Sequence, residues 1–428
     1  MTRHKHKSQK HKPKGTLLAA LDIGSSKIAC FIARVVDDEG TFEVLGVGHH
    51  ASKGIKNGTI VDLDAAESVI RQTVHAAENM AADVMKGYPL REVVVNLPGV
   101  QAASHAYTSD VQIAGHEVTD NDVRRALAKA QEQVLSEDYE LIHTIPMDFR
   151  IDGNEGIRDP RGMFGQDMSV DIHMVTGDMG PLQNMATAIE RSHLDITALC
   201  VSAYAAGLAA LVEDEMDLGC TVIDIGGGVT SFAVFNGGRM VYADAVPLGG
   251  EHITGDIAKG LTTSLHDAER LKALYGSAMA SDMDETELID VPRLGEDDHH
   301  EPNHVPRSLL VGIIQPRIEE IFEMVRAKLN DSGLGNAIGR RVVLTGGSSQ
   351  IQGLKELAGQ VLDKQVRLGK PIRLTGLPDA VSGPSFATTA GLLTYISERV
   401  DEMPAQIMAG AETGSLWERV RFWLKENW

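Results

Sequence analysis

Apolar and polar positions recur along this chain in a pattern that predicts strands and helices in succession. Near residues 17–32, and again near 221–235, an apolar run rich in β-branched residues is followed by Asp-Ile-Gly, small residues and a second apolar run. Each pattern predicts two strands joined by a tight glycine turn. Because the pattern occurs twice, we expect two similar halves.

Other segments extend this picture to an α/β fold. Further strands are predicted at 92–97, 169–175 and 342–345, and helices at 118–127 and from 354 onward. Thr119 is a favourable N-cap for the first of these helices. The stretch between Asp195 and Glu213 carries no charge but is shorter than the roughly 20 apolar residues of a spanning helix. It predicts a buried strand followed by a helix.

The last residues carry a different pattern. On a helix over 415–428, the apolar residues share one stripe and the charged residues lie opposite. The stripe consists of Leu416, Trp417, Val420, Trp423, Leu424 and Trp428, and includes all three tryptophans of the chain. Such a helix suits a membrane interface, with its indole rings at the headgroup boundary. Docking on the protein's own core or on a partner is the alternative. Residues 399–414 predict a tether.

Composition places the chain among ordinary soluble globular proteins. It has 428 residues, of which 43% are hydrophobic and 23% charged, enough for more than one hydrophobic core. The net charge of -20 argues against a protein that binds nucleic acid through its main surface. The three cysteines, Cys30, Cys200 and Cys220, are widely spaced and suggest neither a disulfide framework nor a zinc site.

The basic N-terminal residues 1–15 contrast with the acidic remainder. They hold six cationic residues and no acid, and we expect them to be disordered. Contact with anionic lipid, weak contact with nucleic acid and a role in solubility all remain open for them. The apolar run that follows ends at Asp22 and is too short for the hydrophobic region of a signal peptide.

The glycine turns carry candidate chemistry for a polyphosphate. Glycines and serines let backbone N–H groups donate to phosphate oxygens, and a lysine adds a positive charge. The first turn offers Gly24, Ser25, Ser26 and Lys27, the second Gly226, Gly227, Gly228 and Thr230, and the third Gly346, Gly347 and Ser348. The third turn could receive a base and sugar. Asp22 and Asp224, which precede the first two turns, could hold magnesium through water molecules. The two commonest nucleotide motifs, GxxxxGK[ST] and GxGxxG, do not occur.

This constellation resembles the two phosphate turns and the adenosine turn of the actin, sugar-kinase and heat-shock-chaperone superfamily. Within it, the chain is most similar to the FtsA family of bacterial cell division proteins. The similarity is carried by residues 21–27, 152–160, 162–163, 170–177, 222–228, 268–272 and 344–347. The segment Gly156-Ile-Arg-Asp-Pro160 is the most specific of these. The resemblance implies an actin-like two-lobed ATPase fold, built from a duplicated domain, with the FtsA-type 1C subdomain.

The resemblance also implies a division into subdomains. These are a disordered basic tail at 1–15, subdomain 1A at 16–85 and 176–214, subdomain 1C (SHS2-like) at 86–175, subdomain 2A at 215–248, subdomain 2B at 249–335, and 2A with a return to 1A at 336–398, followed by the linker 399–414 and the membrane-targeting helix 415–428. Where relatives carry a Ser-His-Ile segment, this chain has Gly99-Val-Gln-Ala-Ala-Ser-His105. The contact that relatives make through that segment is therefore not assigned to this chain.

The function that the resemblance implies is that of a peripheral division protein. Such a protein would bind ATP and Mg²⁺, polymerise, and attach FtsZ to anionic lipid on the cytoplasmic face of the inner membrane at the septum, without a nucleic-acid partner. The FtsZ tail would bind region 249–335, while region 86–175 would contribute to self-association and recruit later divisome proteins. Glu269 and Lys272, three apart on a predicted helix, would reach the ribose and adenine; a surface ion pair is the alternative.

The competing hypothesis is a catalytic ATPase of the sugar-kinase or chaperone type. Hydrolysis needs a group that orients or activates the attacking water. The segment before the second turn offers only Ser202 and Tyr204, so we assign no catalytic residue and expect slow or negligible ATP turnover. Residues 281–304 contain nine acidic residues beside His299, His300 and His304, which predict a solvated loop rather than a metal site.

Overall fold

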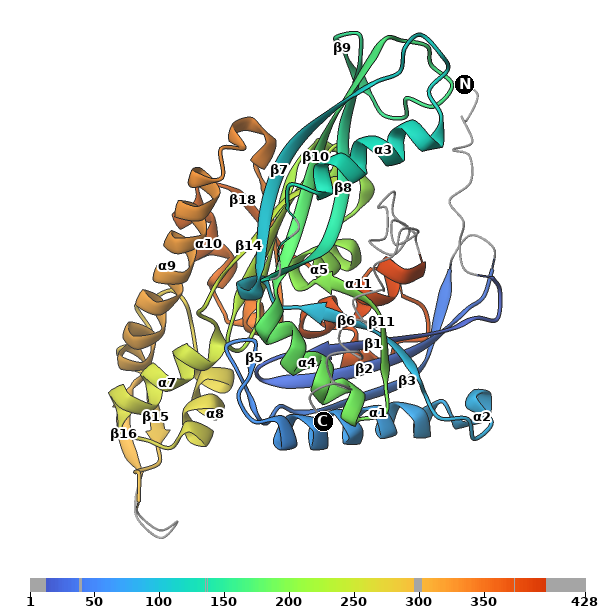
Figure 1. Cartoon of the computed structure of the whole chain (residues 1–428). Coiled ribbons are helices and arrows are strands. Elements are labelled where there is room, and N and C mark those ends of the chain that lie inside the picture. The colour runs from blue at the N-terminus through green and yellow to red at the C-terminus, as the bar shows by residue number, and fades with distance from the viewer. Residues whose placement is uncertain are drawn as a thin grey trace.

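The computed structural model of the chain describes residues 13–37, 41–134, 136, 138–295, 302–372 and 374–397 (Figure 1). The first twelve residues, the linker 399–414, the helix 415–428 and the histidines at 299 and 300 lie outside the described residues. The predictions made for those segments therefore remain predictions.

Two five-stranded sheets have the same strand order and the same strand directions. The first sheet runs β11 (Asp195–Val201), β6 (Glu92–Leu97), β1 (Leu17–Ile23), β2 (Lys27–Val35) and β3 (Phe42–Ala51). The second runs β18 (Gln365–Leu368), β17 (Arg341–Thr345), β12 (Cys220–Ile225), β13 (Thr230–Asn236) and β14 (Arg239–Val246). In each sheet the first three strands named pair in parallel, and the fourth strand, which completes the predicted hairpin, runs antiparallel to both of its neighbours. The two predicted halves are confirmed.

Two helices cross between the sheets. They are α5 (Ser202–Ala210), every residue of which is buried, and α11 (Ala387–Ser397), and they pack on each other. The close crossing depends on a small residue, since a Cβ at Gly391 would lie 1.7 Å from the carbonyl oxygen of Ala205. With α5 and α11 covering one face of the sheets, the central strands are buried on both faces, which is why they read as continuous apolar runs.

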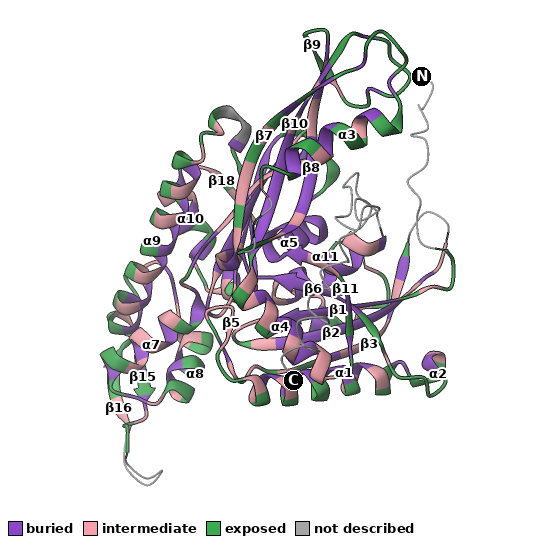
Figure 2. Ribbon diagram, viewed as in Figure 1, coloured by how far each residue is buried: buried purple, intermediate pink, exposed green. Residues whose placement is uncertain are grey.

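The outer faces of the sheets are covered by the remaining helices. On the first lobe these are α1 (Leu63–Met80), α2 (Ala82–Met85) and α4 (Met179–Arg191), with the small hairpin β4 (Ile55–Lys56) and β5 (Thr59–Ile60). On the second lobe they are α6 (Glu213–Leu218), α7 (Gly250–Leu261), α8 (Leu265–Tyr275), α9 (Arg307–Asp331) and α10 (Leu354–Leu362), with the hairpin β15 (Leu288–Val291) and β16 (Asn303–Pro306). Short 3₁₀ helices are η1 (Gly99–Gln101), η2 (Gly335–Ile338), η3 (Gly347–Gln350), η4 (Asp379–Val381) and η5 (Pro384–Phe386). Figure 2 shows exposed residues along the outward sides of α1 and α9 and buried ones in the sheets.

A third, antiparallel sheet projects from the two lobes and has α3 (Asp120–Gln131) on one face (Figure 1). Its order is β7 (Ala102–Gln112), β10 (Asp167–Asp178), β8 (Tyr139–Ile151) and β9 (Asn154–Ile157). Thr119 is the N-cap residue of α3, as predicted, and its N–H and hydroxyl donate to Asp122 Oδ2 at 3.0 and 2.7 Å. Strand β6, which the sequence suggested as part of this inserted unit, pairs instead with β1 and β11 of the first sheet. Its continuous burial suits a parallel strand there.

The base of the inserted sheet is attached to the second lobe. Ser104 of β7 donates its hydroxyl to the carbonyl of Ala243 on β14 at 2.7 Å and accepts the N–H of the same residue at 3.0 Å. The ring nitrogens of His173 on β10 lie 3.1 Å from the carbonyl oxygen of Met240 and 3.1 Å from Ser104 Oγ. The insert therefore belongs by sequence to the first lobe and contacts the second.

Candidate functional site

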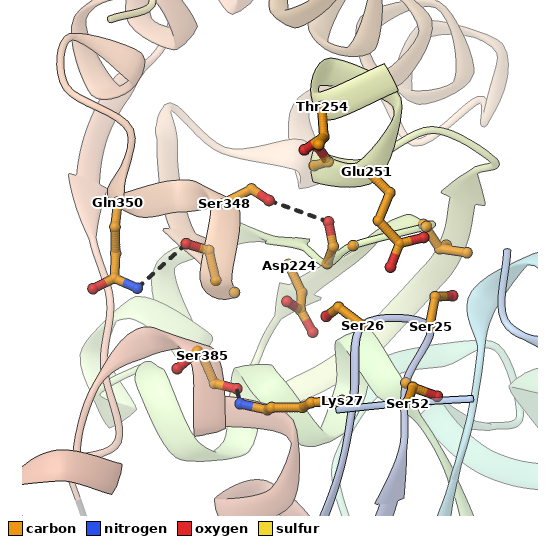
Figure 3. A pocket seen from close by; sticks show the side chains of 18 of the residues that line it. Ser25, Ser26, Lys27, Ser52, Asp224, Glu251, Thr254, Ser348, Gln350 and Ser385 are labelled. Atoms are coloured by element: carbon orange, nitrogen blue, oxygen red, sulfur yellow. Dashed lines mark hydrogen bonds between the residues drawn. The ribbon is translucent and has the colours of Figure 1, made fainter. Parts of the chain in front are cut away.

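The three glycine turns surround one cavity of about 1030 Å³ that lies between the lobes. Fourteen of the predicted site residues line it: Asp22, Gly24, Ser25, Ser26, Lys27, Asp224, Gly226, Gly227, Gly228, Glu269, Lys272, Gly346, Gly347 and Ser348. In Figure 3 the side chains of Ser25, Ser26 and Asp224 point into the same space. Residues that are far apart in the sequence thus share one concave site of a size typical for small-molecule ligands.

The first two turns face each other directly. A Cβ at Gly228 would lie 2.5 Å from Ser25 Oγ, and one at Gly227 would lie 2.8 Å from Ser26 Cβ. Glycine is required at both positions for this approach, because any larger side chain would overlap the opposite turn. The N–H of Gly58, at the tip of the β4–β5 hairpin, donates to Ser25 Oγ at 2.9 Å. The hairpin therefore fixes the position of one of the two predicted phosphate-binding serines.

The two turn aspartates are held by adjacent threonines. Asp22 Oδ2 accepts the hydroxyl of Thr389 at 2.8 Å, and Asp224 Oδ2 accepts the hydroxyl of Thr388 at 2.7 Å. Burial raises the pKa of Asp22, with Lys27 and Thr389 opposing the shift. Burial also raises the pKa of Asp224 to about 6, and the nearby charge of Asp22 adds to that rise. Both carboxylates therefore bear an electrostatic cost that a neighbouring cation would relieve.

These carboxylates fit a divalent cation held through water. Oxygen ligands suit Mg²⁺, which keeps several waters and needs only one or two carboxylates when a substrate phosphate is also present. Both aspartates line the cavity, and each keeps one oxygen that makes no hydrogen bond in the described part of the chain. Among the residues that the structure describes, no group of three His, Cys, Asp or Glu side chains is arranged to hold a metal ion.

Lys27 lies at the floor of the cavity. Its ammonium donates to the carbonyl of Ser385 (Figure 3). The same ammonium lies 3.3 Å from the centroid of the Phe386 ring. Burial lowers the pKa of Lys27 to about 8, although the charges of Asp22 and Asp224 act to raise it. A desolvated lysine interacts more strongly with a phosphate than an exposed one, because the local dielectric is low.

The third turn packs against the second through glycine and serine. Gly346 has φ +87°, and a Cβ there would lie 2.3 Å from Asp224 Oδ1. The hydroxyl of Ser348 donates to the carbonyl of Gly226 at 3.3 Å, and the amide of Gln350 donates to Gly347 (Figure 3). The turn continues as η3, and α10 follows from Leu354, where the sequence predicted a helix.

Glu269 and Lys272 form an ion pair, and both residues line the cavity. Lys272 Nζ donates to Glu269 Oε2 at 2.7 Å, to Thr254 Oγ1 at 2.8 Å and to the carbonyl of Gly250 at 2.9 Å. The lysine side chain is only 10% exposed, whereas that of Glu269 is 56% exposed. The network joins α8 to the first turn of α7 at the edge of the cavity.

Thr230 is the predicted residue that the structure places elsewhere. It is fully buried, and its hydroxyl donates to the carbonyl of Leu248 at 2.8 Å, so it does not line the cavity. As the first residue of β13, it turns its side chain away from the cavity. Ser202 lines the cavity but donates to the carbonyl of Leu97 at 3.1 Å, while Tyr204 packs on the rings of His143, Phe235 and Tyr395.

Among the residues at the site that the sequence did not predict are Glu251, Thr388 and Thr389. Glu251, on the first turn of α7, lines the cavity, and burial raises its pKa. Thr388 also lines it, and Thr389 lies beside it, buried, on α11. An acid in a first helical turn is common, and a pair of threonines in an apolar helix is unremarkable, so neither pattern carries a local signal.

Comparison with known proteins identifies the family of this arrangement. Residues 221–391 match the family model described as cell division protein FtsA, and residues 99–176 match the model of the SHS2 domain inserted in FtsA. The cell division protein FtsA of Rhizobium meliloti (strain 1021) is 42% identical over 425 residues, which cover 96% of this chain and 95% of the relative.

Two solved structures share the fold at low identity. The PilM–PilN type IV pilus biogenesis complex is 17% identical, covers 89% of this chain and 98% of that chain, and has a TM-score of 0.62. MreB5 of Spiroplasma citri bound to ADP is 14% identical, covers 90% of this chain and 97% of that chain, and has a TM-score of 0.51. The predicted actin-like ATPase fold is confirmed. In the described residues, no helix has the length and apolar character needed to span a bilayer.

Proposed function

This chain belongs to the FtsA family of cell division proteins, and on that premise we propose that its cavity binds ATP with Mg²⁺ to favour self-association into filaments. One observation carries the proposal: three glycine turns, the buried carboxylate of Asp22, the half-buried carboxylate of Asp224 and the ammonium of Lys27 converge on a single cavity of about 1030 Å³. The binding of ADP by a protein with the same fold, MreB5 of Spiroplasma citri, is consistent with it.

Each part of the cavity has a distinct role in this proposal. Backbone N–H groups of the first and second turns, the hydroxyls of Ser25 and Ser26, and the ammonium of Lys27 hold the phosphates. Asp22 and Asp224 hold Mg²⁺ through water. When bound, the ion neutralises part of the polyphosphate charge. The third turn, Glu269 and Lys272 receive the base and ribose.

Turnover in this site is proposed to be slow or negligible. A residue that activates water must have a polar atom available near the terminal phosphate. The hydroxyl of Ser202 is held by the carbonyl of Leu97 and by the amide of Asn96, and Tyr204 lies within a buried aromatic cluster. ATP would therefore act mainly by holding the two lobes together. A catalytic ATPase of the sugar-kinase or chaperone type is the alternative, and fast single-turnover hydrolysis would favour it.

We further propose that the protein acts at the septum on the cytoplasmic face of the inner membrane. In this proposal the helix 415–428 lies on anionic lipid, region 249–335 binds the tail of FtsZ, and region 86–175 contacts neighbouring copies and later divisome proteins. The family membership supports this division of roles, and the subdomain boundaries given above, except that β6 belongs to the first sheet, are part of the proposal.

Isothermal titration calorimetry of the full chain with ATP tests the nucleotide role. We expect binding in Mg²⁺ that weakens in EDTA, and a further loss in Asp22→Asn. Asp195→Asn serves as the control, because Asp195 is an exposed aspartate at the start of β11, outside the cavity. Absence of ATP binding by the unaltered chain would refute the proposal.

Co-sedimentation with vesicles of anionic lipid tests the membrane role. Trp417→Glu combined with Trp423→Glu should reduce the pelleted fraction, since burying two indoles contributes on the order of a few kcal/mol before entropy costs. A helix of this size is a weak anchor, so ATP-dependent assembly should strengthen attachment through multivalency. Equal pelleting of both forms would exclude the helix as the anchor.

A further inference from the structure

The segment 384–389, at the start of α11, contacts all three glycine turns. From the first turn, Lys27 donates to the carbonyl of Ser385. From the third, the N–H of Gly346 donates to the carbonyl of Pro384 at 3.2 Å. The hydroxyls of Thr388 and Thr389 reach the aspartates that precede the second and first turns.

The two threonines reach opposite lobes because they are neighbours on a helix. Consecutive residues of an α-helix point about 100° apart, so adjacent side chains can contact different elements. Thr388 donates to Asp224 at the end of β12, and Thr389 donates to Asp22 at the end of β1. Both threonines are well buried, at 7% and 0% exposure. One turn of α11 thus bonds to the corresponding carboxylate of each half of the duplicated fold.

Each bond fixes the direction of a carboxylate. A hydroxyl donating to Oδ2 restricts rotation about the Cβ–Cγ bond, and in the described part of the chain no hydrogen bond involves Oδ1 of either aspartate. Oδ1 therefore remains to accept hydrogen bonds from water molecules bound to a cation. A hydrogen bond to a charged group stabilises by more than one between neutral groups, so this orientation is strongly held.

We propose that Thr388 and Thr389 are positioning residues for the Mg²⁺–ATP complex: they orient Asp224 and Asp22 and set the separation of the two lobes at which both carboxylates face the ion's water shell. This inference rests on the proposed nucleotide function. It assigns to α11 a role at the site beyond its packing against α5.

Thr394 supplies a matched control on the same helix. It is 1% exposed, and its hydroxyl donates to the carbonyl of Ala390 within α11 at 3.4 Å. Thr394→Val therefore removes a buried hydroxyl from α11 without touching either carboxylate. Thr388→Val and Thr389→Val make the same replacement of a hydroxyl by a methyl group. Thr388→Ser and Thr389→Ser keep the hydroxyl and remove only a methyl group.

The experiment measures ATP affinity of the full chain by calorimetry, in Mg²⁺ and in EDTA, for each variant. Loss of one hydrogen bond to a charged group predicts a weakening of Mg²⁺–ATP binding of about tenfold or more for Thr388→Val or Thr389→Val. Binding in EDTA should change much less, so the ratio of the two affinities should fall. The serine variants should restore the ratio, and Thr394→Val should leave it unchanged. Thermal unfolding without nucleotide verifies that each variant is folded.

The outcomes separate this inference from the function on which it rests. If the unaltered chain binds ATP in a Mg²⁺-dependent way and the valine variants keep its affinity ratio, the positioning role is refuted and the nucleotide function stands. Equal losses in Mg²⁺ and EDTA would show that the threonines serve only packing, which also overturns the proposal. If a valine variant does not fold, Thr388→Ala and Thr389→Ala compared with the serine variants give the same test. If the unaltered chain binds no ATP, both the function and this inference fail.

Discussion

Replacing Gly346 by alanine places a methyl group against the carboxylate of Asp224. The added Cβ would lie 2.3 Å from Asp224 Oδ1 and 2.6 Å from the backbone nitrogen of Ile225. The backbone at this position has φ 87° and ψ 163°, a region almost restricted to glycine, which costs other residues about 1–3 kcal/mol. Overlap with backbone atoms cannot be relieved by a rotamer change and adds roughly 1–3 kcal/mol.

The free energy of unfolding of Gly346→Ala should therefore fall by about 2–6 kcal/mol, measured by chemical denaturation without nucleotide. Affinity for ATP should fall as well, because the added methyl displaces Asp224. Gly347→Ala is the control from the same motif: its Cβ would meet nothing closer than Ser385 Cβ at 3.7 Å, an ordinary contact. Its stability should change by less than about 1 kcal/mol. Equal destabilisation by the two substitutions would refute this reasoning.

Three other predictions concern charge and packing. Hydrogen bonds from Arg367 lower the pKa of Glu215 below its usual 4.5, so this carboxylate contributes stability above that value that is lost as pH falls through the folded pKa. Glu215→Gln should lower the free energy of unfolding at neutral pH but have little effect in strong acid, as measured by denaturation at both pH values. Because the pKa of Lys27 is lowered to about 8, ATP affinity measured by calorimetry should decline as pH rises through that value, and Lys27→Met should bind weakly without this dependence. Gly391→Ala, with its Cβ 1.7 Å from a backbone oxygen of α5, should destabilise by about 3 kcal/mol or more, whereas Gly255→Ala, with open space around it, should be neutral or stabilise by about 0.5–1 kcal/mol in thermal unfolding.

The parts of the fold that could be predicted were those that depend on residues close together in the sequence. The hairpins after Leu17 and Cys220, the capped helix after Thr119 and the strand before Gly346 each depend on a few neighbouring residues, and the structure contains all of them. The repeated Asp-Ile-Gly pattern also indicated a duplication, because two copies of one local structure imply two similar lobes. Neither inference needed knowledge of which segments pack together.

The contacts that complete the site could not be predicted, because they join distant segments. Thr388 and Asp224 are 164 positions apart, and Thr389 and Asp22 are 367 apart. In sequence, the two threonines look like part of any buried helix. The prediction for Thr230 was wrong for the opposite reason. Its position next to the second turn suggested a ligand contact, but as the first residue of β13 it directs its side chain toward Leu248. A motif shows which residues are neighbours in the sequence, but it does not show where their side chains point.

The attachment of the inserted sheet to β14 makes that sheet a lever. Its base is attached to β14 through Ser104 and His173, and strand β7 extends from Ser104 to Gln112, a length of about 27 Å at roughly 3.4 Å per residue. If the second lobe turned by about 15°, the order of known rigid-body rotations, and the insert followed it, the far end would move by about 7 Å. A small change of angle at the cavity would then be magnified into a displacement large enough to make or break a contact with a neighbouring molecule.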